Sequence, residues 1–266
     1  MSKDNRSEIA PDPWHNLTQF TSARIALGRT GMSLPTRACL ELQLAHALAR
    51  DAVHIPIDFA GLAQRLKEMG YQSQTLQSQA ENQSVYLQRP DLGRLLSASA
   101  HDCLKGTTPI PADVAVVVAD GLSSKSIENH AEPFLSLLLP HLEENGYRLP
   151  PVCLVKHGRV AIGDAIAEFY KARLCIILIG ERPGLSSPDS MGIYYTYQAK
   201  SGISTDADRN CISNIHGNGL GHGQALKKLL FLINASEKLG LSGVKLKDET
   251  TDTALENQQQ ANFLLD

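Results

Sequence analysis

The sequence predicts an α/β protein in which a mostly helical N-terminal region, residues 1–108, precedes a Rossmann-like domain, residues 109–266, with a mainly parallel sheet. Three observations support this prediction. Apolar residues in the first part recur at helical spacing. In the second part, apolar runs of strand length alternate with helical patterns, which is typical of a parallel sheet covered on both faces. Between the two parts, the Gly- and Pro-containing segment KGTTPIPAD marks a boundary.

The N-terminal region is predicted to contain two helices after a loose polar arm, residues 1–20. The first helix starts near Pro35, which suits a first helical turn, and ends before Pro56. Its apolar stripe consists of Leu40, Leu44, Ala47 and Leu48. The second helix is expected to run from an N-cap at Asp58 to a stop at Gly70.

The next segment is predicted to be less regular. Its Gln- and Ser-rich start, residues 72–84, is expected to be an exposed connection. We then expect a short strand at 84–88, a turn at Pro90, and a helix from Asp91 towards Leu104.

The second part of the chain alternates between the two patterns. Strands are predicted at 114–121, 151–158 and 173–181, with a β-rich segment at 193–198. Helices are predicted at 124–146, 163–172 and 224–240. Pro133 and Pro140 are expected to break or kink the first of these helices.

Polar turns follow three of the predicted strands, with the sequences ADGLSS, KHGR and IGERPG. Ligands bind to open parallel sheets at the carboxyl ends of the strands, so these turns are candidate binding elements. Asp120 could hold a ligand hydroxyl or a metal, but an Asp that caps the next helix is the favoured alternative. Glu181 and Arg182 could contact a ligand or form an internal ion pair, and their place at a strand end slightly favours the ligand.

Two further segments carry weaker patterns. Cys211 and His216, within DADRNCISNIH, could form a nucleophile and base, although a loop rich in capping residues explains the same composition. The segment GNGLGHG, residues 217–223, does not have the G-x-G-x-x-G spacing of a dinucleotide loop. A loop or hinge is therefore favoured over a nucleotide site there.

Composition excludes several classes of protein. The net charge of −3 over 266 residues gives no basic footprint for nucleic acid. No apolar stretch approaches the roughly 20 residues of a membrane span, and the N-terminus lacks the apolar core of a signal peptide. The five cysteines are odd in number and form no CxxC pair, so we expect reduced thiols, a cytoplasmic protein and no metal site.

Seven blocks carry a resemblance to a known family, in order from about residue 20 to 240. They are TSARIALGRTG, LPTRACLELQLAHALARDAVH, YLQRPDLGRLL, ADGLSSKSI, HGRVAIGD, IGERPGLSSPDSMGIYYTY and DADRNCISNIH. In these blocks the chain resembles the small (light) subunit of ethanolamine ammonia-lyase. The resemblance implies an adenosylcobalamin-dependent lyase that converts ethanolamine to acetaldehyde and ammonia.

The resemblance also implies the cofactor contacts. The Val of the GRV block, the Glu of GERPG and the Cys of RNCISN contact cobalamin in the family, and here they are Val160, Glu181 and Cys211. The D-x-H-x-x-G motif of base-off cobalamin proteins is absent, which agrees with a base-on cofactor. Because the radical chemistry belongs to the cofactor, we expect no catalytic residue in this chain.

The implied partner is a large subunit, a TIM barrel that carries the substrate site, in an assembly of six large and six small chains. The small subunit is expected to form part of the cobalamin pocket at the interface. Some family members carry a longer N-terminal extension that directs them to a bacterial microcompartment, and this chain has only a short polar arm before the first block. The alternative is a stand-alone α/β enzyme that binds a nucleotide or flavin.

Overall fold

The computed structural model describes residues 9–10, 12–106 and 111–247. The elements follow in the order η1 (His15–Phe20), α1 (Thr36–His54), α2 (Phe59–Glu68), β1 (Ser73–Gln77), α3 (Gln83–Gln88), η2 (Leu92–Arg94), α4 (Ala98–Lys105), β2 (Val114–Ala119), α5 (Ser124–Glu144), β3 (Val152–Lys156), α6 (Ile162–Phe169), β4 (Leu174–Gly180), β5 (Met191–Tyr197), η3 (Asp206–Asp208), β6 (Arg209–Ile215), α7 (His222–Leu239) and η4 (Gly243–Lys245).

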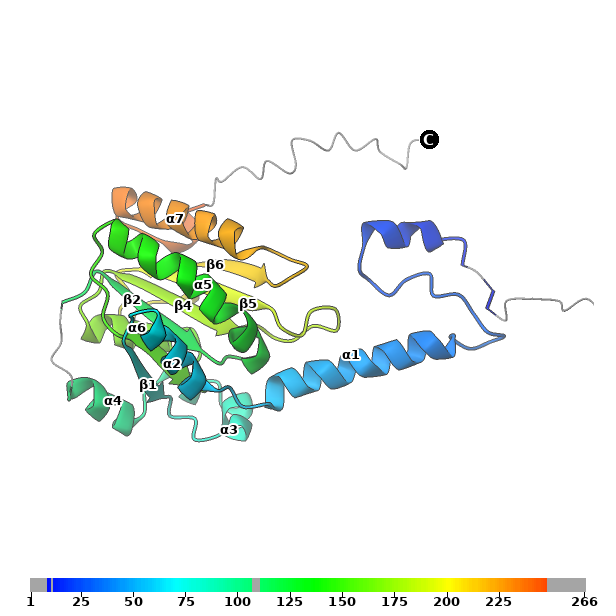
Figure 1. Ribbon diagram of the computed structural model, residues 1–266, viewed down its shortest axis with the longest axis horizontal. Helices are drawn as coiled ribbons and strands as arrows, with labels where there is room; N and C mark the ends of the chain where they lie inside the picture. The colour runs from blue at the N-terminus through cyan, green and yellow to red at the C-terminus, as the bar shows by residue number, and fades with distance from the viewer. Residues whose placement is uncertain (1–8, 11, 107–110, 248–266) are drawn as a thin grey trace, which may run out of the picture.

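The six strands form one sheet in the order β1-β3-β2-β4-β5-β6 (Figure 1). The pairs β1–β3, β3–β2 and β2–β4 are parallel, whereas β5 is antiparallel to both of its neighbours. The predicted α/β class with a mostly parallel sheet is therefore confirmed. Connections from β2 run first to β3 on one side and then to β4 on the other, as in doubly wound sheets. The finer Rossmann-like description stays a prediction.

Alternate residues of the central strands point to opposite sides, and each side has its own core. Val114, Val116 and Val118 of β2 pack with α2, α5 and α7, on what we call the α5 face. Ala115, Val117 and Ala119 pack with α4 and α6, on what we call the α6 face. Because both faces are covered, β2 and β4 are buried along their whole length, which explains their uninterrupted apolar sequences.

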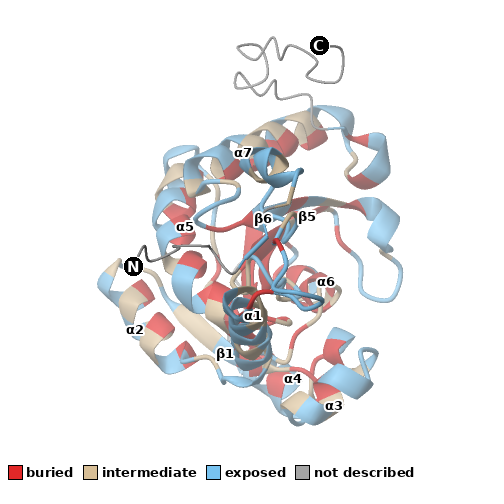
Figure 2. Cartoon of the chain, turned by 90° about the vertical axis from the view of Figure 1, so that its right-hand side faces the viewer, coloured by how far each residue is buried: buried red, intermediate tan, exposed pale blue. Residues whose placement is uncertain are grey.

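The two N-terminal helices lie where the sequence places them. The Asp58 side chain accepts a hydrogen bond from the Gly61 N–H at 2.9 Å and so caps α2. Gly70 follows this helix with a φ of +90°, a conformation that favours glycine. Unlike α2, α1 extends away from the sheet and is largely exposed (Figure 2).

Three expectations for residues 72–104 are wrong. The predicted polar connection contains β1, an edge strand in which only Leu76 is buried, and edge strands tolerate polar sequences because one side faces solvent. The predicted strand at 84–88 lies in α3, where the Asn82 side chain caps the helix by accepting from the Val85 N–H. The predicted helix from Asp91 is two elements, η2 and α4.

Two further differences concern the second part of the chain. Pro133 and Pro140 lie inside α5, which continues from Ser124 to Glu144, so neither residue breaks the helix. The residues around Cys211 form strand β6 and not a loop. The predicted boundary at 108/109 lies outside the described residues. Residues 1–8 and 11 of the predicted loose arm also lie outside them. Within that arm, His15–Phe20 form η1.

Candidate functional site

Asp120, directly after β2, joins the carboxyl ends of two strands. Its Oδ1 accepts from the N–H groups of Gly121 and Gly158, at 2.9 and 3.2 Å, and its Oδ2 accepts from the N–H of His157 at 2.8 Å. Burial raises the pKa of this carboxyl, against the lowering effect of its backbone hydrogen bonds. The expectation that Asp120 caps the next helix is wrong, because Ser123 caps α5. Asp120 thus has a structural role.

Glu181, directly after β4, connects the β4–β5 hairpin to β6. Its Oε2 accepts hydrogen bonds from the Ser190 hydroxyl and, at 3.2 Å, from the N–H of Asn214. Arg182 is exposed, and within the described ranges it forms no ion pair with Glu181. The internal ion pair considered from the sequence is therefore absent there. Oε1 of Glu181 has no hydrogen bond to any described residue.

Glu181 lies on the α6 face of the sheet. A Cβ at Gly192 would lie only 2.9 Å from Glu181 Oε1, so the glycine leaves room for this carboxylate. Gly192 pairs with Ile179, whose side chain belongs to the core of the α6 face. The carboxylate is half-buried, with Oε2 hydrogen-bonded and Oε1 beside Gly192.

Cys211 of β6 pairs with Tyr194 of β5, and Tyr194 packs against the core of the α6 face. Cys211 is exposed, and desolvation of its sulfur raises the pKa of the thiol, against the lowering effect of a hydrogen bond with Tyr194. The Glu181 carboxylate raises this pKa further, which places Glu181 and Cys211 near each other. Sequence reasoning missed Tyr194, because only the β5–β6 register shows which tyrosine of IYYTY lies beside Cys211.

Val160 lies in the loop between β3 and α6. Its half-buried side chain packs against the same core cluster as Tyr194, so it belongs to the α6 face as well. The structure thus brings Glu181 and Cys211 together around Tyr194, and it places Val160 on the same face of the sheet.

On the α6 face, the described helices cover only the Arg209 end of β6 and the neighbouring Thr196 of β5, where Asp164 of α6 pairs with Arg209. Among the described α-helices, only α5 and α7 pack extensively on these two strands, and both lie on the α5 face. Tyr194 and Cys211, on the other side of β5 and β6 and beyond that ion pair, are therefore available to a ligand or partner. We call the surface formed by Val160, Glu181, Tyr194 and Cys211 the open face.

A Cys–His catalytic pair is not formed. The two ring nitrogens of His216 are engaged by Asn214 Oδ1 at 2.8 Å and by the Asn218 N–H at 3.3 Å. The raised pKa also keeps the Cys211 thiol protonated at neutral pH, whereas a nucleophilic cysteine needs a lowered pKa. The alternative of Cys211 as a packing residue therefore fits the geometry better.

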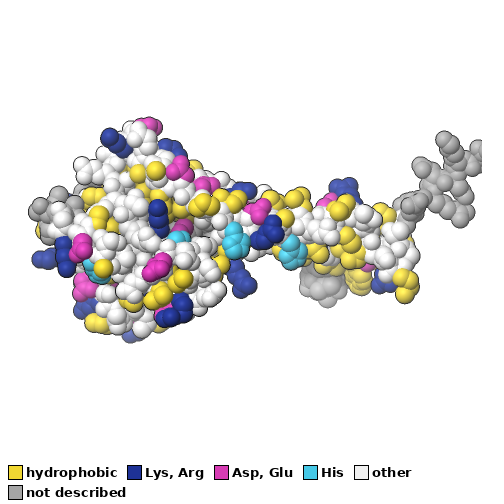
Figure 3. Space-filling view, turned by 90° about the horizontal axis from the view of Figure 1, so that it is seen from below, with side chains coloured by type: hydrophobic (Ala, Val, Ile, Leu, Met, Phe, Trp, Pro, Cys, Tyr) yellow, Lys and Arg dark blue, Asp and Glu magenta, His cyan; other side chains and the backbone are white. Residues whose placement is uncertain are grey.

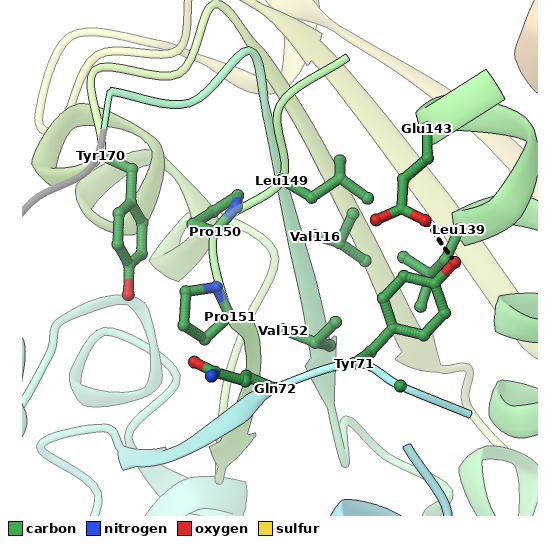
Figure 4. A pocket seen from close by; sticks show the side chains of 11 residues that line it. Tyr71, Gln72, Val116, Leu139, Glu143, Leu149, Pro150, Pro151, Val152 and Tyr170 are labelled. Atoms are coloured by element: carbon green, nitrogen blue, oxygen red, sulfur yellow. Dashed lines mark hydrogen bonds between the residues drawn. The ribbon is translucent and has the colours of Figure 1, made fainter. Parts of the chain in front are cut away.

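A partly enclosed pocket lies at the opposite edge of the sheet from the open face. It has a volume of about 260 Å³ and is lined by residues such as Tyr71, Pro151 and Tyr170 (Figure 4). Its carboxylate, Glu143, accepts a hydrogen bond from the Tyr71 hydroxyl at 2.9 Å. None of the residues predicted from the sequence lines this pocket.

Two properties of the described residues bear on the class of protein. No group of three or more His, Cys, Asp or Glu side chains there is placed to hold a metal ion. Within the same residues, no helix combines the length and hydrophobicity that crossing a bilayer requires.

Comparison with known proteins gives one family. Residues 11–247 match the family model described as Ethanolamine ammonia-lyase light chain (EutC). A Pseudomonas fluorescens protein named Ethanolamine ammonia-lyase small subunit is 51% identical over 261 residues, which cover 96% of this chain and 95% of the relative. Proteins of the same name from Pseudomonas putida and Pseudomonas aeruginosa are each 49% identical, over 98% and 96% of this chain and 98% and 95% of the relatives. The family match spans both α1 and the open face.

Proposed function

The chain belongs to the ethanolamine ammonia-lyase light-chain family, and from this premise we propose that its open face forms one wall of an adenosylcobalamin pocket that a large subunit completes. The enzyme is then a lyase that converts ethanolamine to acetaldehyde and ammonia. The single observation that carries the proposal is that Cys211 is exposed, and Glu181 and Tyr194 partly exposed, on the part of β5 and β6 that the described helices leave open.

The open face has the chemistry that a corrin requires. Cobalamin is a broad apolar macrocycle with amide side chains, and such ligands need apolar contact plus a few placed polar groups. Val160 and the ring of Tyr194 offer apolar contact from the rim of the α6-face core. Glu181 Oε1, which has no hydrogen bond to the described residues, can accept a charge-assisted hydrogen bond from an amide N–H.

The role of this chain is to bind and orient. When bound, adenosylcobalamin supplies the radical that starts the reaction. The Cys211 thiol, whose pKa is raised by desolvation, stays protonated and packs as a small apolar group. No acid or base of the open face is assigned to the substrate, which belongs to the large subunit in this proposal. The base-on form of the cofactor, six copies of each subunit and a place inside a microcompartment are further parts of the proposal.

The alternative of a stand-alone nucleotide or flavin enzyme has less support. The Gly-rich loop at 217–223 would have to cradle a phosphate, but Gly219 is packed tightly at its centre. A Cβ there would lie 2.4 Å from Asn214 O and 2.6 Å from His216 Nε2. This glycine therefore serves close packing of the loop against itself.

Co-expression with the large subunit encoded by the same organism tests the proposal. We expect the two chains to co-purify, to bind cyanocobalamin, and to produce acetaldehyde only when adenosylcobalamin is added. Ethanolamine turnover by this chain alone would refute the division of labour between the two subunits. Co-purification without cobalamin binding would refute the cofactor pocket while leaving the partner in place.

A further inference from the structure

α1 and the segment before it project from the α/β body. Figures 1 and 3 show this part as an extension to one side of the sheet and its helices. With 19 residues, α1 is about 28 Å long. Its last turn is attached to the body, where Gln83 Nε2 donates to Val53 O at 2.8 Å and the helix packs on α5. We call residues 12–34, which precede the helix, the arm; this segment differs from the polar arm predicted from the sequence, residues 1–20.

The projecting part exposes large apolar side chains. On α1, Leu40, Leu44 and Leu48 are 59%, 60% and 40% exposed, along one stripe. On the arm, Met32 and Leu34 are also exposed, and hydrophobic side chains gather on this part in Figure 3. Contiguous exposed apolar surface of this kind marks an interaction site in a soluble protein.

A groove separates the arm from α1 and adds shape to this surface. It has a volume of about 600 Å³, and its lining includes Ile25 and Leu27 of the arm and Ala38 of the helix. Arg37 and Glu41 border the groove and form an ion pair with each other at 2.8 Å. The groove can therefore receive apolar side chains from another protein.

The arm reaches the open-face edge of the sheet. Arg24 Nη2 donates a hydrogen bond to the carbonyl oxygen of Leu185 at 3.1 Å. Leu185 lies in the loop that begins at Glu181, so the arm surface continues from the loop that carries a proposed cofactor contact. A protein that closes the cofactor pocket over this loop is thereby brought next to the arm and α1.

The relatives of this chain and the position of the arm point to the occupant. The relatives are named as small subunits, which implies a large-subunit partner, and the arm contacts the loop that carries Glu181. An isolated helix of this length is also only marginally stable in water. A large subunit that packs on this helix would therefore also stabilise it.

We propose that the arm and α1 form the docking surface for the large subunit, with the Leu40–Leu44–Leu48 stripe and the groove buried in that interface. This inference rests on the proposed function for the identity of the partner. Beyond the proposed function, it assigns most of the contact with the large subunit to the arm and α1, and the cofactor contacts to the open face.

The test is a Leu40→Glu/Leu44→Glu variant of the full chain, co-expressed with the large subunit. Because both side chains are exposed, the isolated variant should retain its melting temperature and circular dichroism spectrum. The affinity for the large subunit, measured by analytical ultracentrifugation, should fall by on the order of tenfold or more. Leu137→Glu on α5 and Leu239→Glu on α7, at positions 43% and 61% exposed, are matched controls and should assemble normally.

Three outcomes would overturn the inference. The double variant could assemble as tightly as the wild type, or the controls could weaken assembly equally. The lone wild-type chain could also form a dimer that Leu40→Glu/Leu44→Glu dissociates, which would make a second copy the occupant. Cobalamin binding by the wild-type complex is measured in parallel, so that failure of the cofactor proposal is distinguished from failure of the docking surface.

Discussion

Arg209 on β6 and Asp164 in the first turn of α6 form a bidentate ion pair that is buried at both ends. Nη1 and Nη2 of Arg209 donate to Oδ1 and Oδ2 of Asp164, each at 2.7 Å, and the two side chains are only 3% and 2% exposed. Thr196 Oγ1 accepts a further hydrogen bond from Nη1 at 3.3 Å. The pair fastens the helix that follows Val160 to the strand that carries Cys211.

Removal of one partner of this pair is expected to destabilise the chain strongly. Asp164→Asn leaves the Arg209 charge buried without its counter-ion, and such losses cost about 3–5 kcal/mol. Urea unfolding followed by circular dichroism measures the effect. Replacement of both residues, Asp164→Leu with Arg209→Met, should recover most of the loss because no charge is left buried.

The control for this prediction is an exposed ion pair. Arg89 and Asp91 are bonded at 2.6 Å but are 60% and 57% exposed, so Asp91→Asn should leave the urea midpoint unchanged. If Asp164→Asn were equally harmless, the buried pair would not fasten α6 to β6.

Glu181→Ala is expected to weaken cobalamin binding by the assembled complex. Loss of a hydrogen bond to a charged group costs about 1.5–3 kcal/mol, which corresponds to a rise in Kd of roughly tenfold or more. Equilibrium titration with cyanocobalamin measures it. Glu181→Gln, which keeps the volume and removes the charge, should give a smaller loss.

Glu144→Ala is the matched control, since Glu144 is exposed at the far end of α5. Its Kd should equal that of the wild type. An unchanged Kd in Glu181→Ala would instead make this chain a purely structural subunit with no polar contact to the cofactor.

The sequence predicts correctly those elements whose signal lies within their own residues, such as an apolar run or a local helix cap. The apolar runs of β2, β3 and β4 reflect burial on both faces, and the Asp58 cap of α2 is a local hydrogen bond. By contrast, β1 and β6 are strands because of the neighbour they pair with. A polar edge strand therefore carries little signal of its own.

The same distinction applies to the open face. Glu181 is predicted as a ligand contact from its place after an apolar strand, which is a property of the sequence alone. For Cys211 the sequence leaves both a nucleophile and a structural role open. Only the β5–β6 register shows that Tyr194 lies beside it. The contact of Asn214 with Glu181 joins residues from two hairpins, and no pattern within either segment indicates it.

Cys211 is expected to react slowly with thiol reagents although it is exposed. Desolvation raises the pKa of the thiol, Tyr194 lowers it and Glu181 raises it, with a net rise. A raised pKa reduces the thiolate fraction at any pH below it, and the thiolate is the reactive form. Alkylation by iodoacetamide, followed by peptide mass spectrometry, should therefore be slower at Cys211 than for a free thiol.

Two comparisons sharpen this prediction. Glu181→Gln should speed alkylation of Cys211, because it removes the neighbouring negative charge. In the assembled complex, cyanocobalamin should protect Cys211 from the reagent, since the thiol then faces the corrin. A thiol that reacts faster than free cysteine would contradict the raised pKa and revive a nucleophilic role.

Stability is expected to fall at mildly acidic pH because of a histidine pair between α5 and α7. His130 Nδ1 and His222 Nε2 are 3.2 Å apart, and His130 Nε2 lies 3.5 Å from Asp189 Oδ2. Desolvation lowers the pKa of His222, and the neighbouring His130 lowers it further. The unfolded chain therefore binds more protons than the folded chain as the pH falls below the usual histidine value, so that the free energy of unfolding decreases.

Melting temperatures measured from about pH 7.5 to about pH 5.5 test this sign. The stability that neutral His222 contributes is present in full above the pKa of this residue in the unfolded chain. It is lost as the pH falls from that value through the pKa of His222 in the folded chain. His222→Gln keeps a polar side chain beside His130 but cannot titrate, so its melting temperature should depend less on pH. His101→Gln, at an exposed position on α4, is the control and should follow the wild type. If His222→Gln and the wild type lost stability in parallel, the acid sensitivity would arise elsewhere, because no other change separates the two proteins.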